Sequence, residues 1–85
     1  MQHTIAESRL IVGKNIRKYR RSSRVSQESL SRRCGIYRTY LSRIEAGSAN
    51  PTLNVLFALA AALKVEVCDL FTDFEKGLGP AADAD

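Results

Sequence analysis

Apolar residues recur along most of the chain at the spacing of an α-helix. Val12, Ile16 and Tyr19 follow one another at i, i+4 and i+7, with basic residues on the remaining arc. Similar spacing elsewhere, divided by short polar or glycine-containing breaks, predicts further helices. We expect five, at about residues 7–21, 27–34, 37–46, 53–63 and 68–75. No segment alternates apolar and polar residues with a period of two, so the pattern predicts an all-α fold without a sheet.

Residues that favour helix ends stand at these breaks. Ser26 can accept a hydrogen bond from a backbone N–H in the first turn of the second helix, and Gly35 can end that helix in the left-handed conformation. Pro51 disfavours helix at the residue before it, and Thr52 can cap the fourth helix. Two helices of similar length joined by a glycine-containing turn form a helix-turn-helix arrangement, in which the second helix can lie in a DNA groove.

The segment 36–45, IYRTYLSRIE, separates two kinds of side chain when it is wound into a helix. The apolar and aromatic residues fall on one arc: Tyr37, Tyr40, Leu41 and Ile44. The opposite arc holds hydrogen-bond donors and one small residue: Arg38, Thr39, Ser42, Arg43 and Ala46. Such a helix fits the DNA major groove, about 12 Å wide, where arginine can bridge O6 and N7 of guanine. The same pattern would also suit any helix that faces water.

The charge of the chain is unevenly distributed. The net charge is +4, but residues 1–47 hold 11 basic and three acidic residues, whereas residues 48–85 hold two basic and six acidic residues. The basic half would attract a polyanion such as DNA or RNA, and the acidic half would be turned away from it. A solvated charged surface is the alternative explanation, and charge alone does not separate the two.

The 85 residues suffice for one small domain. We expect it to span residues 1–75, followed by a flexible tail over residues 76–85, which are poor in apolar side chains. No run approaches the roughly 18–20 apolar residues that cross a membrane, and the first residues lack the pattern of a signal peptide. The protein is therefore expected in the cytoplasm.

Little in the chain suggests a metal site or an enzyme. Cys34 and Cys68 are the only cysteines and His3 the only histidine, whereas a metal site needs three or four clustered ligands. Both cysteines sit among apolar neighbours and are expected in the core. No patterned pair of carboxylates and no phosphate-binding glycine loop occurs, so we expect neither catalysis nor a cofactor.

The segment SQESLSRRCGIYRTYLSRIEAGSANPTLNVLFALAAALKV resembles the Cro and CI type (XRE-like) helix-turn-helix domains of phage repressors and bacterial regulators. The shared features are SQ at the second helix, a glycine in the turn, YLSxIExG, an NPT loop and LxxLAxAL. The phrase RTYLSRIE looks most like the controller proteins of restriction-modification systems. The resemblance implies a lambda-repressor-like fold of five helices. It also implies a regulator that binds double-stranded DNA on the nucleoid of a bacterium or phage host.

The resemblance implies roles for individual residues. Base edges would be met by Arg38, Thr39 and Arg43, with Ser42 beside them on the outward arc. Gln27 would touch a base or a phosphate at the edge of the groove. Phosphates would be met by Ser26, Tyr40, Ser48 and Asn50, with Arg17 on the basic face of the first helix. Arg20 and Glu45 match a family pair that forms a partly buried ion pair between the first and third helices. Tyr37 and Val67 depart from the family, which usually has a capping residue and a serine at these positions.

The fourth helix is apolar nearly all round and must be covered on more than one side. One recognition helix reads only a few base pairs, so we expect a homodimer on a palindromic operator. The dimer region would be residues 53–75, with contacts from Leu70, Phe71 and Phe74. The alternative is that these side chains fill the core of the domain itself.

Two classes of function follow from these patterns. The first is a sequence-specific transcriptional regulator, a repressor or an activator according to the position of its operator. No small-molecule ligand is expected, so its occupancy would follow its concentration. The second is a protein-interaction module, such as an antitoxin, which a tightly co-purifying partner would distinguish.

Overall fold

The computed structural model describes residues 3–74, which form five helices. These are α1 (Ile5–Ser22), α2 (Gln27–Cys34), α3 (Arg38–Glu45), α4 (Leu53–Leu63) and α5 (Val67–Leu70). No strand occurs among the described residues, and the predicted all-α class is confirmed. The predicted tail, residues 76–85, lies outside them. Within the same part of the chain, no helix has both the length and the apolar content needed to cross a membrane.

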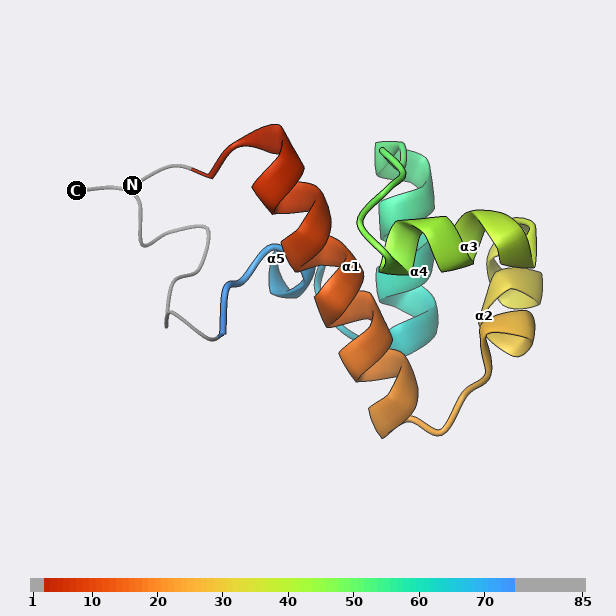
Figure 1. Cartoon of the computed structure of the whole chain (residues 1–85). Helices are drawn as coiled ribbons and strands as arrows, with labels where there is room; N and C mark the ends of the chain where they lie inside the picture. Colours follow the sequence, from red (N-terminus) through yellow and green to blue (C-terminus); the bar gives the residue numbers. More distant parts are fainter. Residues whose placement is uncertain (1–2, 75–85) are drawn as a thin grey trace.

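The five helices pack around a shared core (Figure 1). α1 packs against α3, α4 and α5, whereas α2 packs against α3 and α4, and α4 also contacts α5. Figure 1 shows α2 and α3 together on one side of the molecule and α5 on the other, with α1 between them. The helix-turn-helix pair therefore projects from a scaffold that the other helices provide.

Side chains from every helix build the core. The fully buried ones are Ile16, Leu30, Leu41, Ile44, Leu59 and Leu70. Burying an apolar side chain of this size stabilises the fold by about 1.5–3 kcal/mol relative to leaving it exposed. Isolated helices shorter than about 12–15 residues are marginal in water, so the four helices after α1 depend on this shared burial for their stability.

Local capping sets several helix ends. α1 begins earlier than the apolar pattern predicted, because the Thr4 hydroxyl accepts from the Glu7 N–H at 3.1 Å while the Glu7 carboxylate accepts from the Thr4 N–H at 2.8 Å. α2 and α4 begin and end at the predicted residues. The hydroxyls of Ser26 and Thr52 cap them, each by accepting from a backbone N–H of the first turn.

Gly13 allows α1 to pack directly on the end of α3. A Cβ at this position would lie 2.6 Å from the carbonyl oxygen of Glu45 and would also overlap the carbonyl oxygen of Ile44. Both are backbone atoms, which cannot rotate away as a flexible side chain could. The glycine therefore determines how closely α3 lies against α1.

The last helix is shorter than the one predicted over residues 68–75. α5 ends at Leu70, and Phe74 lies beyond it. The side-chain Nδ2 of Asn15 in α1 donates to the carbonyl oxygens of Leu70 at 2.9 Å and Thr72 at 2.8 Å. These carbonyl oxygens therefore accept hydrogen bonds from a side chain of α1, where a longer α5 would have supplied backbone N–H groups of its next turn.

Two predictions about exposure are wrong. Leu70 is fully buried in the core, so it offers no surface to a second chain and does not belong in the predicted dimer contact. Cys68 is exposed and not in the core, because α5 is one turn long and turns Leu70 inward in its place. Cys34 was also predicted in the core; it is half-buried and packs against the core from outside.

Candidate DNA-binding surface

α2 and α3 are joined by a tight turn. Gly35 ends α2 in the left-handed conformation, with φ 68° and ψ 30°, which glycine adopts without steric cost. The Ile36 N–H donates to the Ser31 carbonyl oxygen at 3.0 Å and closes the turn. α3 starts at Arg38, after Tyr37, whose side chain makes no capping hydrogen bond to the described residues. Tyr37 is the extended N-cap residue, so the helix begins one residue later than predicted and without a side-chain cap.

α3 has one buried face and one exposed face. Leu41 and Ile44 are buried in the core, whereas Arg38, Thr39 and Arg43 are exposed. The remaining predicted contact residues of this helix, which are half-buried at the edges of the exposed face, are Tyr40 and Ser42. The exposed face thus consists of hydrogen-bond donors on a helix that is anchored from behind.

The residues predicted to meet phosphates at the two ends of this surface are exposed: Ser26, Ser48 and Asn50. The Ser26 hydroxyl oxygen accepts from the Ser29 N–H at 3.0 Å, and the Ser48 hydroxyl donates to the Arg43 carbonyl oxygen at 3.2 Å. A hydroxyl has one proton to donate, so Ser26, which only accepts here, can still donate to a phosphate oxygen. Ser48 must release the Arg43 carbonyl oxygen before it can do so.

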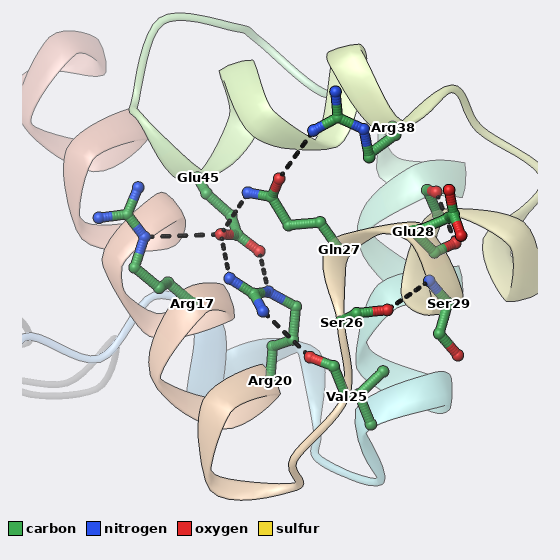
Figure 2. A network of polar contacts seen from close by, with 10 residues as sticks. Arg17, Arg20, Val25, Ser26, Gln27, Glu28, Ser29, Arg38 and Glu45 are labelled. Atoms are coloured by element: carbon green, nitrogen blue, oxygen red, sulfur yellow. Dashed lines mark hydrogen bonds and ion pairs between the residues drawn. The ribbon is translucent and has the colours of Figure 1, made fainter.

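Glu45 forms a buried ion pair with Arg20 (Figure 2). Nε and Nη2 of Arg20 donate to the two carboxylate oxygens at 2.6 and 2.9 Å, the forked geometry that suits a carboxylate. Nη1 of the same arginine donates to the Val25 carbonyl oxygen at 3.0 Å. The Glu45 side chain is 0% exposed. The Glu45 carboxylate therefore connects α3 to α1, and Arg20 connects both to the loop before α2. The ion pair that the family resemblance implied is present.

Two residues predicted to contact DNA also turn toward Glu45. Nε2 of Gln27 donates to Oε1 of Glu45 at 3.0 Å, and Nε of Arg17 lies 3.5 Å from the same oxygen. Figure 2 shows Arg17 on one side of the carboxylate and Gln27 on the other, with Arg38 beyond Gln27. The sequence pattern did not indicate this convergence, because the residues come from three different helices.

The hydrogen bonds around Glu45 keep it ionised. Burial raises the pKa of its carboxyl, but the hydrogen bonds from Arg20, Gln27 and Arg17 outweigh burial, and the pKa lies below its ordinary value. The pKa of Arg20 is raised, mainly by its hydrogen bond to Glu45. Because the negative charge is buried and paired, it does not repel a polyanion from the surface of α3.

Sequence reasoning missed Gly13, which lets α1 approach the site. Its signal was available, since a glycine inside an otherwise regular helix pattern often marks a close backbone approach. Asn15 was also missed, and its signal was weaker, because one polar residue on an amphipathic helix usually faces water.

The glycine turn and the exposed donor face of α3 define a helix-turn-helix DNA-binding domain. The pattern of the helix-turn-helix family HTH_3 matches residues 16–70. The chain belongs to this family of DNA-binding transcriptional regulators.

Individual relatives are regulators of similar length. Control protein C.SmaI of Serratia marcescens is 40% identical over 62 residues, covering 73% of this chain and 74% of that protein. Control protein C.BamHI of Bacillus amyloliquefaciens is 41% identical over 63 residues, covering 73% of this chain and 78% of that protein. The structure of the restriction-modification controller protein C.AhdI of Aeromonas hydrophila matches with a TM-score of 0.73 and 32% identity, covering 76% of this chain and 98% of that one. The family resemblance read from the sequence is confirmed.

Proposed function

We propose that this protein is a sequence-specific transcriptional regulator that binds a palindromic operator as a homodimer, with α3 in the major groove. The observation that carries the proposal is the two-sidedness of α3, which exposes Arg38, Thr39 and Arg43 while its other face is buried. Arginine can bridge O6 and N7 of guanine, and threonine can meet an acceptor or a thymine methyl group. These three side chains would choose the sequence, with Ser42 beside them.

The residues around α3 would set its position on the duplex. Those proposed to meet phosphates are Arg17, Ser26, Tyr40, Ser48 and Asn50. Such contacts fix the register of a recognition helix and make the affinity fall with salt. Arg17 could exchange its long contact with Glu45 for a phosphate, because Arg20 and Gln27 hold that carboxylate at shorter distances.

A second copy of the chain is the proposed partner for apolar side chains that the domain leaves exposed. Leu53 and Phe57 lie one turn apart on α4 and are 67% and 60% exposed, and Phe74 is 48% exposed. Phe71 is half-buried and would contribute its remaining surface. Two chains related by a two-fold axis would place their α3 helices about 34 Å apart in successive major grooves, which is why we propose a palindromic operator.

The similarity to C.SmaI and C.BamHI leads us to propose, more narrowly, that the regulated genes belong to a restriction-modification system. We further propose that no small-molecule ligand controls binding, so that operator occupancy follows the concentration of the protein, as autoregulation requires. The protein would act in the cytoplasm, on the nucleoid.

Selection of bound duplexes from a random pool tests the proposal. The wild-type chain should enrich a two-fold symmetric consensus, and Arg38→Ala should lose preference at one base pair in each half-site. Arg33→Ala removes an exposed arginine from α2 and should keep the consensus. Enrichment of no sequence would contradict sequence-specific binding, and enrichment of a single asymmetric half-site would contradict the homodimer.

A further inference from the structure

Gln27 lies between the buried ion pair and the exposed start of α3, and its amide bonds to both. Its Nε2 donates to Oε1 of Glu45 at 3.0 Å, and its Oε1 accepts from Nη1 of Arg38 at 3.5 Å (Figure 2). A continuous line of polar contacts therefore runs from Arg20 through Glu45 and Gln27 to Arg38. It joins the interior of the domain to a residue on the proposed DNA-reading face.

Glu45 determines which way the Gln27 amide points. An ionised carboxylate can only accept hydrogen bonds, so the NH₂ group of Gln27 must face it. The reverse orientation would bring two oxygens together with no proton between them, inside a buried cluster where an unmade hydrogen bond is costly. The carbonyl oxygen of Gln27 is consequently turned away from Glu45 and toward Arg38.

The contact with Gln27 occupies one end of the Arg38 guanidinium. Because Nη1 is engaged, Nε and Nη2 remain as a pair of neighbouring donors. Arg20 uses the corresponding pair of atoms to bridge the two oxygens of Glu45. A pair of donors with this spacing can also bridge O6 and N7 of guanine. The 3.5 Å distance is long for a hydrogen bond, so Arg38 can adjust when a base replaces water.

We propose that Gln27 is a positioning residue for Arg38 and does not itself read a base, an inference that rests on the proposed function. Glu45 orients Gln27, and Gln27 holds Arg38 with its Nε and Nη2 donors turned outward. This assignment replaces the contact with a base or a phosphate that the family resemblance implied for Gln27.

The test compares discrimination by the wild-type chain and its variants on the selected duplex and on duplexes with each base pair replaced in turn. Gln27→Met keeps the length of the side chain and removes both hydrogen bonds. At the base pair where Arg38→Ala loses preference, the ratio of affinities for the selected and the replaced base pair should fall about threefold to tenfold. This is the net contribution of about one hydrogen bond. In the Arg38→Ala background Gln27→Met should cause no further loss there. Glu28→Gln, a matched control, breaks only the exposed 3.3 Å pair with Arg32 and should leave discrimination unchanged.

Three results would overturn the inference. Relaxed preference at a different base pair would make Gln27 a reader of that base pair. An equal loss of affinity for every duplex would make it a phosphate contact, and unchanged discrimination would leave it without a role. If Gln27→Met unfolds at a lower temperature than the wild type, Gln27→Ala is the second variant. Each of these results leaves the proposed function in place, whereas a wild-type chain that selects no duplex would overturn both.

Discussion

The side-chain Nδ2 of Asn15 donates to the carbonyl oxygen of Leu70 at 2.9 Å, and to that of Thr72 at 2.8 Å. This buried amide joins the middle of α1 to the end of α5, two segments more than 50 residues apart in sequence. α5 is a single turn and has little stability of its own. Its position therefore depends on the amide of Asn15 and on the burial of Leu70.

Asn15→Ala should destabilise the domain by about 1–3 kcal/mol, because it leaves buried carbonyl oxygens without a donor. Urea unfolding followed by circular dichroism measures the change. Asn54→Ala is the matched control, since Asn54 is exposed on α4 and its loss should change stability by no more than about 0.5 kcal/mol. Equal unfolding midpoints for the two variants would show that the Asn15 amide contributes nothing.

Gly13→Ala should destabilise the domain, although alanine is the better helix former by about 0.5–1 kcal/mol. The added methyl group would overlap the carbonyl oxygens of Ile44 and Glu45, so α1 and α3 must move apart at a cost of about 1–3 kcal/mol. Thermal unfolding should show a lower midpoint, and DNA affinity should fall because α3 is displaced. Improved stability would mean that the two helices separate without cost.

Glu45→Gln should lower stability at neutral pH by about 1.5–3 kcal/mol, because Arg20 loses its charged partner. It should also flatten the response to acid. The pKa of Glu45 in the folded chain lies below its ordinary value of 4.5, so the unfolded chain binds the proton more readily. The stabilisation is therefore present above pH 4.5 and is lost as the pH falls below 4.5 through the folded pKa.

Urea unfolding over an acid series measures this effect, with Glu28→Gln as the control for an exposed carboxyl. The wild type should lose more stability than Glu45→Gln over the acid window. Parallel losses in these two chains would assign the acid response to other groups.

Lys64→Gly should stabilise the domain by about 0.5–1 kcal/mol. Lys64 ends α4 in the left-handed conformation, with φ 60° and ψ 41°, which costs a residue with a side chain roughly 1–2 kcal/mol. Glycine removes this strain but loses part of the gain to the greater freedom of the unfolded chain. Lys64→Ala removes the charge and keeps the strain, so a gain of stability in both variants would point to charge and not to conformation.

Phe57→Glu and Phe74→Glu, made separately, test the proposed dimer surface. Placing a carboxylate in an apolar contact should weaken self-association at least about tenfold, as a shift toward monomer in sedimentation equilibrium. Tyr37→Glu, on an exposed ring at the start of α3, should leave association unchanged. A dimer that persists in both phenylalanine variants would place the contact on another surface.

Features that depend on neighbouring residues could be predicted from the sequence. The spacing of apolar residues and the caps at Ser26, Gly35 and Thr52 were enough for the bounds of α2 and α4. The same periodicity separated the exposed Arg38 and Arg43 from the buried face of α3. The family resemblance added the pairing of Arg20 with Glu45, which no local pattern contains.

The chain's own sequence thus determined its helices and the face of α3 that meets solvent, because hydrogen bonds and periodicity within a helix involve residues only three or four positions apart. Only the tertiary structure decided that α5 stops at Leu70, that the backbone of α3 packs closely against Gly13, and that Gln27 bonds to Glu45. Each of these depends on a backbone carbonyl or a carboxylate that another helix brings into reach. Such a meeting exists only after the core has packed. A glycine within a helix can mark a close approach, but spacing along one helix does not show which backbone comes close.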